Sequence, residues 1–199
     1  PLQLCQMTAQ LANGGFKIYP KIVVEKNSKK IEDIRVMMNE NRKHLNKVNK
    51  GLQEATELLS FLNKKEYKPL FKNAKNINLV QEAMFASTNE VRGTSYTSRI
   101  DNPKYQFAGK TGTSQVKRIT KAERELELKT FEIPYNERDH ALYIAFGPYK
   151  NPRYALSVVI EHGGSGSSAA APIAKKLFKL IVDRHELREQ TKIQKGIKI

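Results

Sequence analysis

The run Phe-Ala-Gly-Lys-Thr-Gly-Thr-Ser-Gln occupies residues 107–115 and decides how the fold is interpreted. The residues after Thr111, Gly-Thr-Ser-Gln-Val, favour a strand over a helix, and we predict a strand over residues 105–116. The Gly109-Lys110-Thr111 step also suggests a phosphate-binding loop. That loop requires a glycine at position 104, where this chain has lysine, so we reject a nucleotide site.

Carried on a strand, this run has the chemistry to bind a carboxylate. Lys110 supplies a cation that would pair with the carboxylate and polarise a neighbouring hydroxyl. The hydroxyls of Thr111 and Thr113 can bind the same group, and the backbone N–H of Thr113 can serve as an oxyanion-hole donor. Gly112 leaves space where a peptide backbone must approach closely. Lys-Thr-Gly is short enough to arise by coincidence, so this interpretation depends on the rest of the chain.

A serine nucleophile should accompany such a binding strand. The only serine followed three residues later by lysine is Ser114, with Lys117. Because side chains alternate along a strand, these two would face opposite sides, and we do not interpret them as a catalytic pair. Ser87 and Asn89 have the spacing of a Ser-x-Asn motif, but they close a predicted helix and are interpreted as capping its end.

The first half of the chain predicts helices separated by polar sequence. Apolar residues recur at helical spacing over residues 2–13, 51–63 and 76–89. Residues 16–24 are short, apolar and interrupted by a proline, which predicts an extended or edge-strand segment. Residues 25–75 are the most polar part of the chain.

The final third changes to a strand pattern. Residues 141–147 and 154–161 are strand-like, and the connection 148–153, short and rich in Pro and Asn, fits an antiparallel hairpin. Residues 117–136 form a charged excursion between the strand at 105–116 and this hairpin. These patterns predict three strands that follow one another along the chain.

A helix is predicted after the glycine-rich turn that ends the last strand. Ser167 or Ser168 is expected to cap it, and it is expected to run to about Arg188. Four side chains are expected to pack its apolar face on the sheet: Ile173, Leu177, Leu180 and Ile181. Residues 189–199 are expected to form a solvated tail.

Composition excludes several classes of site. The formal net charge of +15 suits nucleic acid, anionic lipid or an acidic wall polymer, but the lysines are scattered and few aromatics interleave with them, which favours solvated faces. The single cysteine, Cys5, excludes an internal disulfide and a cysteine-based metal site. The histidines do not cluster with carboxylates at metal spacing, so no metal or cofactor is expected. No apolar run approaches the roughly 20 residues that span a bilayer, and the start at Pro1 looks like a cut or processed end.

Five blocks of sequence, taken in order, resemble one family. They are residues 1–15, 107–115, 137–147, 151–164 and 169–178, and they cover about half of the chain. Together they resemble the C-terminal part of the transpeptidase domain of class B penicillin-binding proteins, with the elongation-type members most similar. Lys-Thr-Gly is one of three motifs that penicillin-interacting serine enzymes carry.

The resemblance implies a partial α+β fold of the serine β-lactamase-like type. The three strands would belong to a five-stranded antiparallel sheet packed against helices, with the N-terminal half of the domain missing. Residues 1–188 would form the C-terminal portion, interrupted by a variable insertion at 25–75. Four residues would form the third family motif, binding the substrate or antibiotic carboxylate and shaping the oxyanion hole: Lys110, Thr111, Gly112 and Thr113.

The resemblance also implies an activity that this chain would not perform alone. The family cross-links peptidoglycan stem peptides ending in D-Ala-D-Ala through an acyl-serine intermediate, and β-lactams acylate the same serine. That serine, its lysine and the second motif lie upstream of Pro1 in the family, so no catalytic residue is expected here.

The partners implied by the resemblance are the stem peptide, β-lactams and the N-terminal remainder of the transpeptidase. The full-length protein would bind a SEDS-type glycosyltransferase at the periplasmic face of the inner membrane. Nucleic acid is not expected as a partner. The alternative is a non-catalytic remnant or wall-binding module from a split gene.

Overall fold

Three antiparallel strands form the centre of the computed structural model. The structure describes residues 1–20, 69–121, 125–126 and 128–194. The helix predicted at 51–63 and most of the polar region around it lie outside the described residues. Within them, Phe16 forms an isolated antiparallel bridge with Pro69, in the segment predicted to be extended.

The strands are β1 (Ala108–Ser114), β2 (His140–Gly147) and β3 (Tyr154–Ile160), in the order β1-β2-β3. Each falls inside or within one residue of its predicted range. In the hairpin between β2 and β3, the N–H of Arg153 donates to the carbonyl oxygen of Gly147 at 3.0 Å. The predicted hairpin and the α+β class are therefore confirmed.

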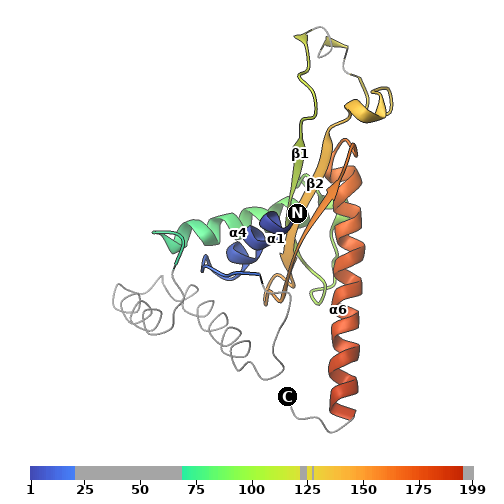
Figure 1. Ribbon diagram of the computed structural model, residues 1–199. Coiled ribbons are helices and arrows are strands. Elements are labelled where there is room, and N and C mark those ends of the chain that lie inside the picture. The colour runs from blue at the N-terminus through green and yellow to red at the C-terminus, as the bar shows by residue number, and fades with distance from the viewer. Residues whose placement is uncertain (21–68, 122–124, 127, 195–199) are drawn as a thin grey trace.

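Helices cover both faces of this sheet (Figure 1). α1 (Leu2–Ala12) and α4 (Ala74–Asn89) pack on one face, and α6 (Ala171–Gln194) packs on the other. α1 stops at Asn13, whose side-chain oxygen accepts hydrogen bonds from the N–H groups of Gly15 and Phe16. The sheet is thus the middle of three layers, and β1 and β3 are its edges among the described strands.

The larger hydrophobic cluster lies between the sheet and α6. Its buried members are Phe107, Ala141, Tyr143, Ala145, Leu156, Val158, Ala170, Ala171, Ala174, Phe178 and Val182. On the opposite face a smaller cluster joins Met84 of α4 to Ala108 and Phe146. Alternate residues of β2 enter the two clusters, as the period of a strand requires.

The prediction of which side of α6 packs on the sheet is wrong. Ile173, Leu177 and Leu180 are 39%, 38% and 61% exposed, and Ile181 is half-buried. The residues that face the sheet are Ala171, Ala174, Phe178 and Val182. Both stripes have helical spacing, so periodicity alone could not choose between them. The alanines allow α6 to approach the sheet closely, while the Phe178 ring stacks on Phe107 with centroids 5.0 Å apart.

The start of α6 also differs from the prediction. A π-helical turn, η4 (Gly166–Ala170), precedes α6 and contains both serines that were expected to cap it. Ser165, at the start of η4, makes no side-chain capping bond, and its Oγ lies 2.9 Å from Ser167 Oγ instead. The turn passes so close to the sheet that a Cβ on Gly166 would lie 2.5 Å from the carbonyl oxygen of Gly112.

The end of α6 lies beyond the predicted boundary near Arg188. The helix continues to Gln194, because residues 189–194 contain neither glycine nor proline and are mostly good helix formers.

At the other end of the molecule, the charged excursion between β1 and β2 extends past the sheet (Figure 1). There Lys117 Nζ pairs with Glu137 at 2.5 Å, next to the short helix η3 (Tyr135–Glu137).

Candidate functional site

Lys110 lies in the middle of β1 with its side chain exposed. Its Nζ donates to the carbonyl oxygen of Thr111 at 2.8 Å and lies 3.4 Å from Thr111 Oγ1. Side chains of neighbouring strand residues point to opposite faces, so the long lysine stem must bend around the open edge of β1 to make these contacts. The Lys110 ammonium group and the Thr111 hydroxyl therefore lie together on an accessible strand edge.

Thr113 lies two residues further along β1, on the same face as Thr111. Its side chain is exposed, so both hydroxyls can reach a ligand that lies along the edge of β1. Between them, Gly112 is approached from one side by Gly166 of η4. We predicted that a ligand would approach Gly112 closely. On the side of η4, it is Gly166 of this chain that does so.

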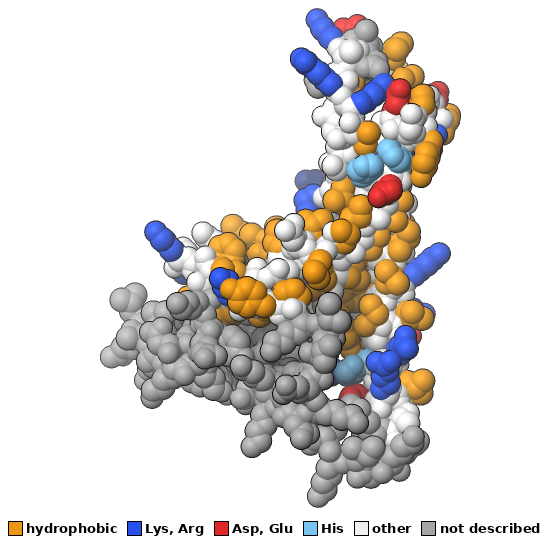
Figure 2. All heavy atoms as spheres, in the orientation of Figure 1, with side chains coloured by type: hydrophobic (Ala, Val, Ile, Leu, Met, Phe, Trp, Pro, Cys, Tyr) orange, Lys and Arg blue, Asp and Glu red, His pale blue; other side chains and the backbone are white. Residues whose placement is uncertain are grey.

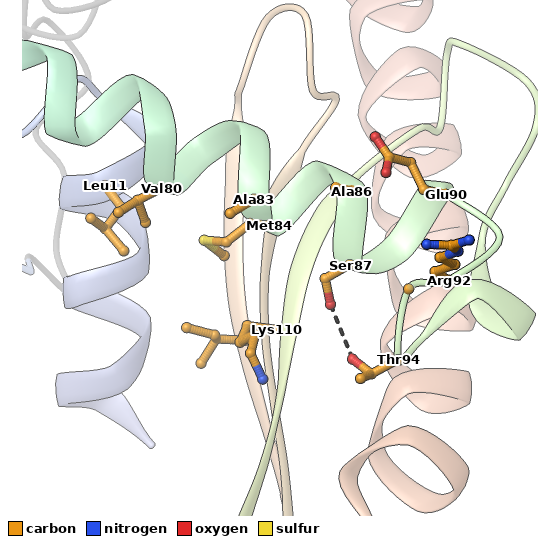
Figure 3. Close-up of a pocket in the computed structure, with 12 residues that line it drawn as sticks. Leu11, Val80, Ala83, Met84, Ala86, Ser87, Glu90, Arg92, Thr94 and Lys110 are labelled. Carbon is orange, nitrogen blue, oxygen red and sulfur yellow. Dashed lines mark hydrogen bonds between the residues drawn. The ribbon is translucent and has the colours of Figure 1, made fainter.

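A row of hydroxyls leads from the C-terminal end of α4 to this edge. Ser87 Oγ lies 3.2 Å from Thr94 Oγ1 (Figure 3). Thr94 Oγ1 in turn lies 3.2 Å from Thr111 Oγ1. Sequence reasoning missed Thr94, because nothing local connects a residue in a loop with a strand that begins fourteen positions later. Ser87, which was interpreted only as part of a helix cap, joins the site through this row.

A buried hydroxyl network fixes β1 against α4. Tyr143 of β2 passes over Gly109, and its hydroxyl lies 2.9 Å from Thr88 Oγ1 and 3.0 Å from Ser95 Oγ. Ser95 Oγ donates to the carbonyl oxygen of Ser87 at 3.0 Å. All three hydroxyl groups are buried and mutually hydrogen-bonded, which is the condition under which buried polar groups stabilise a fold.

Burial raises the pKa of the Tyr143 hydroxyl above its ordinary value of 10.0, although the hydrogen bonds with Ser95 and Thr88 oppose the shift. The neutral phenol is thus favoured in the folded chain relative to the unfolded chain. Its contribution to stability is complete below pH 10 and is lost as the pH rises through the raised pKa.

We expect Tyr143→Phe to lower the free energy of unfolding at pH 7 by about 1–3 kcal/mol, because Thr88 and Ser95 lose a buried partner. We also expect the variant to lose less stability than the parent between pH 9 and 11. Urea titrations across this range provide the measurement. Tyr135→Phe, at a hydroxyl on a 62% exposed side chain, is the control. Equal losses of stability in parent and Tyr143→Phe would contradict the prediction.

Asn89, at the end of α4, holds the segment that leads into β1. Its Nδ2 donates to the carbonyl oxygen of Phe85 at 3.0 Å and to that of Phe107 at 2.9 Å. The first bond lies within the last turn of the helix, and the second crosses to the residue before β1. Asn89 thus acts at the helix end as predicted and in addition ties α4 to the segment that leads into β1.

An open trough of ≈ 490 Å³ lies beside Lys110, between α1, α4 and the sheet (Figure 3). Its apolar lining includes Leu11, Val80, Met84 and Ile144, while its polar lining includes Ser87, Thr94 and Lys110. Figure 2 shows hydrophobic side chains gathered at the surface over this part of the molecule. The site therefore combines a cationic and hydroxyl-bearing strand edge with an adjoining apolar surface.

Ser114 and Lys117 remain poor candidates for a nucleophile and its base. Ser114 is the last residue of β1, and Lys117 pairs with Glu137 in the excursion.

Sequence reasoning did not pair His140 with His162, but the His162 N–H donates to His140 Nδ1 at 2.9 Å. The register of β2 and β3, in which Ala141 faces Ile160, could have indicated that these histidines are neighbours.

Other classes of site find no support in the part of the chain that the structure describes. No three His, Cys, Asp or Glu side chains come together there in a way that could hold a metal ion. No helix in that part has both the length and the apolar character needed to cross a bilayer.

The family model for the penicillin binding protein transpeptidase domain matches residues 1–179. The chain belongs to this family. The match covers α1, α4, the three strands and the first part of α6, and it confirms the resemblance drawn from the sequence blocks.

Curated relatives are similar over about half of the chain. Peptidoglycan D,D-transpeptidase MrdA of Salmonella typhimurium (strain SL1344) is 41% identical over 105 residues, which are 53% of this chain and 16% of the relative. The protein of the same name from Acinetobacter baumannii is 43% identical over 79 residues, which are 40% of this chain and 11% of the relative. This transpeptidase-family chain therefore spans well under a third of the length of these relatives.

A solved structure is similar over most of the chain. The crystal structure of Pseudomonas aeruginosa PBP2 in complex with WCK 5153 has a TM-score of 0.53 and 26% identity, and the alignment covers 90% of this chain and 30% of that one. The similarity supports the partial α+β transpeptidase fold.

Proposed function

We propose that this transpeptidase-family chain forms one wall of a peptidoglycan D,D-transpeptidase active site. In this proposal β1 binds the terminal carboxylate of a stem peptide that ends in D-Ala-D-Ala, or the carboxylate of a β-lactam. The observation that carries the proposal is the position of the Lys110 ammonium group beside Thr111 Oγ1 on the exposed edge of β1. The names of the MrdA relatives agree with this substrate class.

The chemistry of the edge suits this ligand. A carboxylate only accepts hydrogen bonds, and Lys110 together with the hydroxyls of Thr111 and Thr113 supplies donors that an anion can use. The backbone N–H of Thr113 is the proposed oxyanion-hole donor. Gly112 keeps the strand free of a side chain between the two threonines.

The nucleophile is proposed to come from the N-terminal remainder of the transpeptidase. In the family the serine and its lysine precede the segment that this chain resembles. The apolar trough beside Lys110, with Leu11, Val80 and Met84 in its lining, offers a surface on which that remainder would pack. Packing there would bring its serine next to the bound carbonyl group.

The setting of the complete enzyme follows from the same proposal. The full-length protein would work at the periplasmic face of the inner membrane, where peptidoglycan is cross-linked, and would meet a SEDS-type glycosyltransferase there. The chain alone would bind its ligand without forming an acyl-enzyme.

We expect Lys110→Gln to weaken binding of N-acetyl-D-Ala-D-Ala to the 199-residue chain by about 10- to 100-fold, because a charge-assisted hydrogen bond to the carboxylate is lost. Titration followed by NMR shifts of residues 110–113 measures the affinity. Lys150→Gln removes the same charge from the exposed connection between β2 and β3 and is the matched control. Equal affinity of the two variants would contradict the proposed site.

A fluorescent penicillin tests the proposal that the serine nucleophile comes from the N-terminal remainder of the transpeptidase. The purified chain should show no stable label, because the proposed nucleophile is contributed from upstream. Stable acylation of Ser114 would overturn this assignment, as well as the argument that Ser114 and Lys117 do not act together.

A further inference from the structure

Thr94 is the central member of the hydroxyl row that reaches the binding strand. Its Oγ1 lies 3.2 Å from Ser87 Oγ on one side and 3.2 Å from Thr111 Oγ1 on the other. Lys110 Nζ also lies 3.4 Å from Thr111 Oγ1. A residue from the loop after α4 thus contacts the hydroxyl that the proposed function assigns to carboxylate binding.

The backbone on either side of Thr94 is held against α4. A Cβ on Gly93 would lie 2.5 Å from the carbonyl oxygen of Ala86, so the glycine lets the loop pack directly on the last turn of the helix. The N–H of Ser95 donates to the carbonyl oxygen of Ser87 at 3.0 Å, and the Ser95 side chain is part of the buried network with Tyr143. Thr94 is therefore presented to Thr111 by a fixed turn, which is how a supporting residue holds a functional one.

The direction of the hydrogen bonds gives this row a role in binding. Each hydroxyl has one proton to donate. When Thr94 donates to Thr111 Oγ1, the Thr111 proton is free to point at a ligand. A carboxylate can only accept, so its binding favours the arrangement in which Ser87 donates to Thr94, and Thr94 to Thr111. Hydroxyls that donate in one direction also polarise one another.

We infer that the Thr94 hydroxyl is a positioning group that holds Thr111 Oγ1 in the orientation that donates to the bound carboxylate. This inference rests on the proposed function of the β1 edge. Threonine has few allowed rotamers, so a single neighbour can select the one that points its hydroxyl along the strand edge. Thr94 itself need not touch the ligand.

A ligand-free experiment tests the positioning directly. Three-bond couplings of the Thr111 side chain report its rotamer populations in the 199-residue chain. We expect one dominant rotamer in the parent and in Thr94→Ser, and averaging between rotamers in Thr94→Val. Thr191→Val, on the exposed surface of α6, is the matched control and should leave the Thr111 rotamer unchanged. An unchanged Thr111 rotamer in Thr94→Val would overturn the inference.

Binding of N-acetyl-D-Ala-D-Ala to the same variants tests the positioning role of Thr94 separately from the proposed carboxylate site on β1. We expect Thr94→Val to weaken binding by about threefold to tenfold and Thr94→Ser to bind within about twofold of the parent, since one hydrogen bond is lost or kept. Equal affinity of parent and Thr94→Val would overturn the inference and leave the proposed site intact. Absence of binding to the parent chain would overturn the proposed site, and the rotamer measurement would then decide the positioning role alone.

Discussion

Phe178→Ala should lower the free energy of unfolding of this chain by about 3–5 kcal/mol, the usual cost of removing a buried aromatic ring. Phe178 is fully buried between α6 and the sheet, stacked on Phe107. A Cβ on Gly147 would lie 2.8 Å from Phe178 Cε1, so strand and ring are in close contact. Because domains are stable by only about 5–15 kcal/mol, this loss is a large fraction of the total. Urea unfolding followed by circular dichroism provides the measurement.

Leu180→Ala, two residues along the same helix, is the matched control. Its side chain is 61% exposed, and alanine has the higher helix propensity, so we expect a change of less than about 1 kcal/mol. A loss as large as that of Phe178→Ala would mean that the outer stripe of α6 is covered in solution.

This comparison shows where sequence patterns are sufficient and where they fail. Strands β2 and β3 are recognisable because runs of strand-forming residues are bounded by Gly, Pro and Asn. The orientation of α6 is not, because the helix carries one stripe of large apolar residues and a second stripe built from Ala171, Ala174 and Phe178. The close approach of helix and sheet favours the smaller residues, and that distance is a tertiary property.

The same distinction holds at the site. Lys110, Thr111, Gly112 and Thr113 are adjacent in sequence, so a joint role in binding a carboxylate can be proposed from one short run. Thr94 and the buried network around Tyr143 could not be predicted, because they meet β1 only after α4 and the loop behind it have packed on the sheet. Hydroxyl groups on separate segments leave no periodic signal in a sequence.

The packing of η4 on the binding strand makes Gly166→Ala a severe substitution for both stability and binding. The added Cβ would lie 2.5 Å from the carbonyl oxygen of Gly112 and still closer to that of Leu142. Both obstacles are backbone atoms of paired strands, so neither can move aside as a flexible side chain would. We expect a loss of about 1–3 kcal/mol in the free energy of unfolding, the range for overpacked sites.

Gly166→Ala should disturb the proposed ligand site on β1 more than it disturbs the strands further from Gly166. Relief of the clash must shift β1 at Gly112, which lies between Thr111 and Thr113. Amide shifts and hydrogen exchange of Gly112 and Thr113 should change before those of β3, and affinity for N-acetyl-D-Ala-D-Ala should fall by at least about tenfold, the effect of losing one charge-assisted hydrogen bond. Ser168→Ala, at an exposed position of the same turn, should match the parent in both measurements. If Gly166→Ala destabilised the chain but bound the dipeptide normally, the strand edge would be independent of η4. The glycine would then serve packing alone.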